Sequence, residues 1–119
     1  MTGPLERQTD GRRAIKLLFE ATNAYEVHAA LALFAPGAVI DDPAVGRVFE
    51  GEASIEEYLT RFFVGYQTNT TIVSMTMEVP GTIDVHTDFT GTFGHEVGIL
   101  RFTFDDDGSI RHLHADLEG

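Results

Sequence analysis

The second half of the chain alternates between apolar and polar residues over most of its length, and few folds accommodate such a pattern. Between residues 83 and 89, for example, Ile83, Val85 and Phe89 are interleaved with acidic residues and a histidine. Alternation of this kind is typical of β-strands that bury one face and expose the other. Turn-forming sequences at 80–81 and 105–108 separate the runs. We therefore expect antiparallel strands over residues 70–79, 83–90, 97–104 and 110–117.

The first half of the chain predicts helices instead. Ile15, Leu18 and Phe19 recur at the spacing of one helix face, and Asp10 can cap the start of that helix. A Ser-x-x-Glu capping pattern at Ser54 precedes an apolar stripe that ends near Tyr66. The helices expected from these patterns cover residues 10–23, 26–34 and 54–66. Between the second and the third, we expect a short strand at 39–41 and a loop across 46–51.

Helices that precede a run of antiparallel strands indicate an α+β fold with the helices on one face of the sheet. A strongly curved sheet wrapped over three N-terminal helices forms a cone, and the open end of the cone is a pocket. The chain has 119 residues, of which 43% are hydrophobic, which suits one domain with one core. We assign residues 1–9 to a flexible tail and residues 10–119 to this single domain.

The composition argues against several classes of partner. The net charge is −11 and the basic residues are scattered, so nucleic acid should be repelled. No apolar run is long enough to cross a bilayer, and the start of the chain does not resemble a signal peptide. We therefore expect a cytoplasmic protein without a membrane partner. Because the chain has no cysteine, it has no disulfide and no thiolate ligand or nucleophile.

Several short motifs occur in an order that resembles one superfamily. They are Leu33-Phe34-Ala35, Asp42-Pro43, Gly51, Ile55, Phe102-Thr103-Phe104 and Asp107-Gly108-Ser109-Ile110. In this order and spacing they resemble the nuclear transport factor 2-like superfamily, and within it the ketosteroid isomerases and the SnoaL-like polyketide cyclases. The resemblance covers about residues 11–118 and implies a cystatin-like cone of the kind expected above.

The resemblance also implies roles for individual positions. Asp42 lies where the ketosteroid isomerases have the general base. Leu18 and Leu100 lie where those enzymes have the tyrosine and the protonated aspartate of an oxyanion hole. Loss of one such donor typically costs about two to three orders of magnitude in rate, so we do not expect the isomerase reaction in its usual form. Asp42 should point into the cone, and Asp41 should point toward solvent.

We expect the pocket to be lined mainly by apolar side chains. On the last strand, Leu113, Ala115 and Leu117 alternate with polar residues and should face the cone. Tyr58 is either a core residue of the third helix or a group that offers its hydroxyl to a ligand. The expected ligand-binding residues are Leu18, Tyr58, Phe62, Leu100, Phe102, Leu113 and Leu117, with Asp42 as the catalytic group.

The polar positions of the late strands leave alternatives open. His112, His114 and Asp116 share one face of the last strand, and His86 lies on the same outer face by parity. This face is solvated, forms a dimer contact or supplies metal ligands; we expect no metal site. If the face assignment is inverted, these residues become the active-site set. Glu96, near a predicted turn, is either solvated or a second carboxylate in the cavity.

These observations favour a small protein that holds an apolar, polycyclic or carbonyl-bearing molecule. We expect an enzyme of the isomerase or cyclase type that uses Asp42 as general acid and base. One alternative is a binding module without catalysis, which Leu18 and Leu100 favour. The other is an interaction protein that uses the outer face of the sheet. We expect no cofactor, and we expect a homodimer formed through that outer face.

Overall fold

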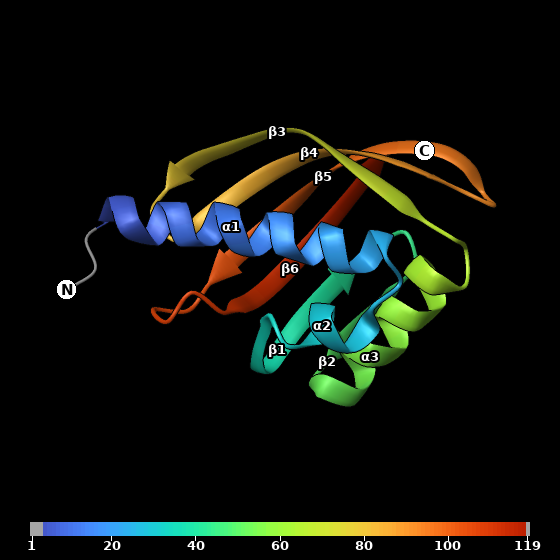
Figure 1. Cartoon of the computed structure of the whole chain (residues 1–119), viewed down its shortest axis with the longest axis horizontal. Helices are drawn as coiled ribbons and strands as arrows, with labels where there is room; N and C mark the ends of the chain where they lie inside the picture. Colours follow the sequence, from blue (N-terminus) through green and yellow to red (C-terminus); the bar gives the residue numbers. More distant parts are fainter. Residues whose placement is uncertain (1–3, 119) are drawn as a thin grey trace.

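The protein folds into a strongly curved six-stranded sheet with helices against its concave side, as the computed structural model shows for residues 4–118 (Figure 1). Side-chain positions are described for residues 11–116. The elements follow in the order α1 (Pro4–Asn23), α2 (Val27–Leu31), β1 (Phe34–Asp42), β2 (Arg47–Glu50), α3 (Glu52–Leu59), η1 (Thr60–Val64), β3 (Asn69–Val79), β4 (Thr82–Gly91), β5 (Gly94–Phe104) and β6 (Ile110–Glu118). The α+β fold expected from the sequence is confirmed.

The strands are arranged in the order β2-β1-β6-β5-β4-β3. Neighbouring strands are antiparallel except for β1 and β6, which run parallel with Ile40 opposite Leu113. The sequence predicted an antiparallel sheet, and this one pair departs from it. Strand β1 also begins earlier than expected, because Phe34 pairs with Ile110. For the same reason helix α2 ends at Leu31 and not near residue 34.

Helix α1 begins at Pro4, before the cap expected at Asp10. Proline suits the first turn of a helix, because its fixed φ is helical and its missing N–H has no partner to lose there. The helix therefore includes most of the residues assigned to a tail, whose flexibility stays a prediction. Further along the helix, Ile15, Leu18 and Phe19 are buried against the sheet, as their spacing predicted.

The loop expected across residues 46–51 contains strand β2, which pairs with β1 as a hairpin. Helix α3 then begins directly after Gly51, whose φ of 86° is a conformation that glycine adopts without strain. The capping pattern at Ser54 therefore lies inside the helix and does not start it. The last turn of this helical segment, η1, is a π-helix, a local widening often found at functional sites.

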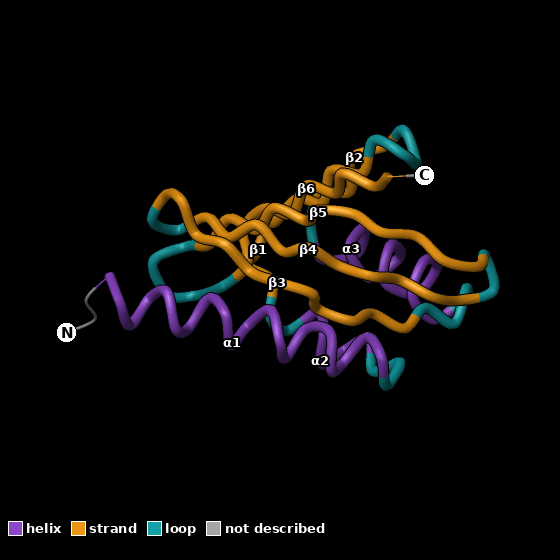
Figure 2. The backbone as a smooth tube through the Cα atoms, turned by 90° about the horizontal axis from the view of Figure 1, so that it is seen from above, coloured by secondary structure: helices purple, strands orange, loops and turns teal. Residues whose placement is uncertain are grey.

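The curvature of the sheet leaves room between its concave face and the helices. Strands β3, β4 and β5 arch over α1, while α3 and η1 lie at one end of the molecule (Figures 1 and 2). Toward the N-terminal end of α1, Gly11 lies close to the side chains of Ile83 and Phe104. Further along the helix, the rings of Phe19 and Phe102 meet edge to face, with centroids 6.2 Å apart. The core is thus packed along most of α1 and opens where α3 and η1 face the sheet.

Candidate functional site

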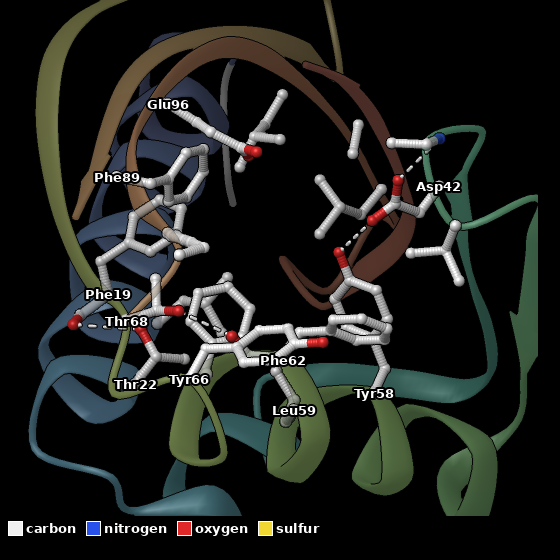
Figure 3. A pocket seen from close by; sticks show the side chains of 18 of the residues that line it. Phe19, Thr22, Asp42, Tyr58, Leu59, Phe62, Tyr66, Thr68, Phe89 and Glu96 are labelled. Carbon is white, nitrogen blue, oxygen red and sulfur yellow. Dashed lines mark hydrogen bonds between the residues drawn. The ribbon is translucent and has the colours of Figure 1, made fainter. Parts of the chain in front are cut away.

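A cavity of about 450 Å³ lies between α1, the α3–η1 segment and the concave face of the sheet (Figure 3). A cavity of this size can hold a drug-sized molecule. Its walls are mainly apolar, and eight aromatic side chains contribute to them: Phe19, Phe34, Tyr58, Phe62, Phe63, Tyr66, Phe89 and Phe93. Lys, Arg and His are absent among the described residues that line it. The carboxyl groups in the lining belong to Asp42 and Glu96.

Asp42 is the last residue of β1 and its side chain is only 3% exposed. Its Oδ1 accepts a hydrogen bond from the Ala44 backbone N–H at 3.1 Å, and its Oδ2 accepts one from the Tyr58 hydroxyl at 2.7 Å. The first bond belongs to the turn after β1, so Asp42 is a turn residue and a cavity residue at once. Two partners fix the carboxylate in one orientation and leave it capacity to accept a further bond.

Asp41 points away from the cavity, because successive side chains of a strand face opposite sides of the sheet. Its Oδ2 lies 3.2 Å from Nδ1 of His114 on the neighbouring strand β6. The two adjacent aspartates thus have different surroundings. The expectation that Asp42 faces inward and Asp41 outward is confirmed.

Tyr58 reaches Asp42 from α3 and is itself 7% exposed. Burial of the hydroxyl raises the pKa of Tyr58 well above its usual value, and the negative charge of Asp42 and the hydrogen bond to it act in the same direction. The phenol therefore keeps its proton and donates to Asp42 across the neutral pH range. This contact orients the carboxylate toward the cavity.

A row of aromatic rings runs from Tyr58 toward the open end of the cavity. Ring centroids are 5.0 Å apart between Tyr58 and Phe62, 5.8 Å between Phe62 and Tyr66, and 6.2 Å between Tyr66 and Phe93. The π-helical segment η1 supplies Phe62, and the turn between β4 and β5 supplies Phe93. The planes of neighbouring rings are tilted by 45°, 59° and 38°, so the row forms a continuous apolar wall that can contact a ring system with both ring edges and ring faces.

The opposite wall carries the second carboxyl group. Glu96 on β5 is half-buried, pairs across the sheet with Phe89 on β4, and extends into the cavity (Figure 3). Nearby hydroxyl groups have internal partners: Thr22 donates to the Phe19 carbonyl at 3.3 Å and Thr68 donates to the Phe62 carbonyl at 2.7 Å. Their oxygens remain available only as acceptors toward the cavity.

Most of the residues predicted from the sequence meet in this cavity. Its lining includes Asp42 together with Leu18, Tyr58, Phe62, Leu100 and Leu113. Phe102 does not line it: the side chain is fully buried between Phe19 and Phe104 in the core. The side chain of Leu117 lies outside the described residues, so its place in the pocket stays a prediction.

The sequence analysis left Glu96 undecided and did not select Phe89, Phe93 or Tyr66 as ligand-binding residues. Phe89 and Glu96 lie on strands joined by a hairpin, and only their register shows that they are cross-strand neighbours. The alternation of apolar residues on β4 was a signal for the inward position of Phe89. Tyr66 ends the apolar stripe of the third helix, which was a signal for its place at the cavity, although its side chain is 43% exposed. Phe93 is 39% exposed, and nothing in the local sequence distinguishes it from an ordinary surface residue.

The outer face of the sheet carries the histidines, as the alternation on β6 predicted. Leu113 and Ala115 line the cavity, whereas His112, His114 and Asp116 face the other side. Within the part of the chain that the structure describes, no three His, Asp or Glu side chains are arranged to hold a metal ion. Among the same residues, no helix is long and apolar enough to cross a bilayer.

The fold and the sequence both have known relatives. Three similar solved structures are a protein of unknown function with a cystatin-like fold from Methylobium petroleophilum, the epoxide hydrolase/cyclase-like enzyme SalBIII of pyran ring formation in salinomycin, and Rv0760c from Mycobacterium tuberculosis in complex with estradiol-17beta-hemisuccinate. Their sequence identities to the chain are 19%, 18% and 14%, and the TM-scores are 0.83, 0.82 and 0.78. The alignments cover 93%, 93% and 89% of this chain, and 77%, 92% and 92% of the respective structures.

At these identities the likeness establishes the fold, which is the nuclear transport factor 2-like or cystatin-like fold expected from the sequence. No curated protein matches the sequence. The model of one family, the SnoaL-like domain, matches residues 15–113, which include all of the residues that line the cavity except Ala115. The chain is therefore a member of the SnoaL-like domain family.

Proposed function

We propose that the protein binds an apolar, ring-containing molecule in the cavity and that Asp42 transfers a proton to or from it. The observation that carries the proposal is a carboxylate, 3% exposed, held by Ala44 and Tyr58 in the wall of an otherwise apolar cavity. A carboxylate in such surroundings can act as a general base, and its protonated form can return the proton. The similar structures of the epoxide hydrolase/cyclase-like enzyme SalBIII and of Rv0760c in complex with estradiol-17beta-hemisuccinate support this class of ligand and reaction.

The expected absence of the isomerase oxyanion hole bears on the reaction type. Leu18 and Leu100 both line the cavity and offer no hydrogen-bond donor to a substrate oxygen. Reactions that develop a full negative charge on that oxygen would be poorly stabilised here. We therefore favour a cyclisation or dehydration, in which Asp42 moves a proton without an enolate, over the steroid isomerisation.

The same two leucines favour a second candidate function. A cavity with one oriented carboxylate and apolar walls can hold a molecule without transforming it. Asp42 would then accept a hydrogen bond from a hydroxyl group of the ligand, as buried polar groups in binding sites commonly do. The two functions differ in whether removal of the Asp42 charge abolishes a reaction or only weakens binding.

The test uses 5-nitrobenzisoxazole, whose ring C–H proton is removed by a base as the N–O bond breaks, to give the coloured 2-cyano-4-nitrophenolate. The nitro-substituted ring delocalises the negative charge of the product, so the reaction needs a base and can proceed without an oxyanion hole. We expect the protein to accelerate this reaction and Asp42→Asn to reduce the acceleration by about 10²- to 10⁴-fold. Asp41→Asn is the matched control, because it removes the neighbouring charge on the outer face. Equal rates for the protein and for Asp42→Asn would refute the catalytic role and leave the binding function.

We also propose that the protein is a homodimer formed through the outer face of the sheet. The helices cover only the concave side. On the outer face, Ile99 is 42% exposed and lies among oppositely charged groups such as Arg101 and Asp84, which bond at 2.8 Å. A self-complementary contact needs such a mixture of apolar and oppositely charged groups.

A further inference from the structure

We infer that the end of the cavity around Glu96 is a subsite for an organic cation, and that the ligand is an apolar amine bound in its protonated form. This inference rests on the proposed function, because it requires a ligand in the cavity. It adds the charge of the ligand and the end of the cavity at which that charge lies. Three features of the cavity carry it.

The first feature is the condition of Glu96 itself. Its carboxylate is half-buried and makes no hydrogen bond or ion pair with another described residue. Some other acidic side chains of the described part face basic partners: Asp84 bonds to Arg101, Asp88 to His95 and Glu57 to Arg47. Others, such as Glu50 and Glu78, are exposed to water and need no partner. A half-buried carboxylate that extends into a cavity without a partner gains from a cation that the ligand brings.

The second feature is the aromatic surroundings of this end of the cavity. Phe89 is the direct cross-strand neighbour of Glu96. Tyr66 and Phe93 border the same cavity with ring centroids 6.2 Å apart. The Thr92 N–H donates to the Tyr66 carbonyl at 2.9 Å, so the β4–β5 turn is held against the end of η1. The faces of aromatic rings attract ammonium groups, and a carboxylate beside such rings strengthens the attraction.

The third feature is the charge of the whole lining. The lining contains two acidic residues, Asp42 and Glu96, and none of its described residues is basic. An anionic ligand would therefore lose its hydration without gaining a counter-charge. The deeper acid, Asp42, already accepts two hydrogen bonds. This leaves Glu96 as the carboxylate without a partner, and the cation should bind there.

The experiment compares three probes that share one steroid skeleton and differ in charge at carbon 17. They are the amine in which a 17β-amino group replaces the 17β-hydroxyl group of estradiol, estradiol itself, and estradiol-17β-hemisuccinate. Affinities are measured by isothermal titration calorimetry at neutral pH. We expect the amine to bind about tenfold more tightly than estradiol, which corresponds to about 1.4 kcal/mol. The hemisuccinate should bind more weakly than estradiol.

Glu96→Gln should bring the affinities of the amine and of estradiol together, because the side chain keeps its shape and loses its charge. Glu78→Gln is the matched control: it makes the same change of net charge on the exposed part of β3 and should keep the preference for the amine. A second comparison, Asp42→Asn, locates the cation. Loss of the preference in Asp42→Asn but not in Glu96→Gln would overturn the assignment to Glu96.

The outcomes separate this inference from the proposed function. Binding of the probes with no preference for the amine would overturn the inference and leave the proposed ligand class intact. A preference for the amine that survives in Glu96→Gln would overturn it as well, since the general negative charge of the protein would then explain it. No binding of any probe would count against both proposals.

Discussion

At the scale of single residues, the contact between Tyr58 and Asp42 determines how the carboxylate is presented. Removal of the hydroxyl in Tyr58→Phe leaves a buried carboxylate oxygen without its donor. We expect a loss of about 1–3 kcal/mol in the free energy of unfolding near neutral pH. Urea denaturation followed by circular dichroism measures it, with Tyr25→Phe as the control because Tyr25 is 44% exposed. A Tyr58→Phe protein as stable as the parent would contradict the role given to this bond.

The raised pKa of Tyr58 gives the same variant an alkaline signature. Above about pH 10, an unfolded chain releases the phenol proton while the folded protein keeps it, so unfolding is favoured as the pH rises. Tyr58 therefore contributes a decline of at most about 1.4 kcal/mol per pH unit in the free energy of unfolding. Tyr58→Phe should lack this contribution. The difference in the free energy of unfolding between the parent protein and Tyr58→Phe should therefore become smaller between pH 9 and pH 11.

Single positions were predictable where strand or helix periodicity decides which way a side chain points. The stripe on the third helix placed Tyr58 on the inner face. The family resemblance placed Asp42 inside the cone, and strand alternation then placed Asp41 outside. The hydrogen bond between Tyr58 and Asp42 was not predictable, because it depends on the packing distance between α3 and β1. Phe102 shows the opposite failure. The alternation of β5 shows that Phe102 points inward. Whether an inward residue lines the cavity or packs in the core depends on which part of α1 it faces, and Phe102 packs against Phe19.

At the scale of elements, Asn23 joins the end of α1 to the edge strand β3. Its side-chain Nδ2 donates to the Thr70 carbonyl at 2.9 Å, and its Oδ1 accepts the Thr70 N–H at 2.7 Å. The amide thus takes the place of a neighbouring strand for a residue that is 5% exposed. We expect Asn23→Ala to lower the free energy of unfolding by about 1–3 kcal/mol, because both backbone groups of Thr70 lose their partner.

Urea denaturation and the exchange rate of the Thr70 amide measure this effect. Faster exchange of that amide distinguishes a lost hydrogen bond from a general loss of stability. Asn69→Ala is the matched control, since Asn69 is exposed at the start of the same strand. Unchanged exchange at Thr70 in Asn23→Ala would contradict the proposed role.

Long elements were predictable from periodicity, and short ones were not. The strands β3 to β6 and the apolar faces of α1 and α3 agree with their patterns to within a few residues. Strand β2 was missed, because four residues between two glycines carry no alternation that distinguishes a strand from a loop. The start of α3 was misplaced for a related reason: a capping pattern at Ser54 is a local signal, whereas the backbone turns at Gly51.

At the scale of the whole molecule, the proposed dimer is open to a direct measurement. We expect light scattering at tens of micromolar to give twice the mass of the chain, because the sheet has helices on only one side. Ile99→Asp places a charge on the exposed outer face and should shift the mass toward the monomer without changing the cavity. Leu17→Asp is the control, since Leu17 is 40% exposed on α1. A monomer at these concentrations would contradict the prediction.

The parallel pairing of β1 with β6 has a consequence for how the protein acquires its shape during synthesis. Strand β6 leaves the ribosome after the other five strands, yet it lies between β1 and β5 in the sheet. Until it arrives, the β1–β2 hairpin with Asp42 has no strand to connect it to β3, β4 and β5. Contacts so distant in sequence, such as Ile40 with Leu113, form slowly because a long loop must close first. The wall of the cavity can therefore be complete only after β6 has been synthesised and has inserted between β1 and β5.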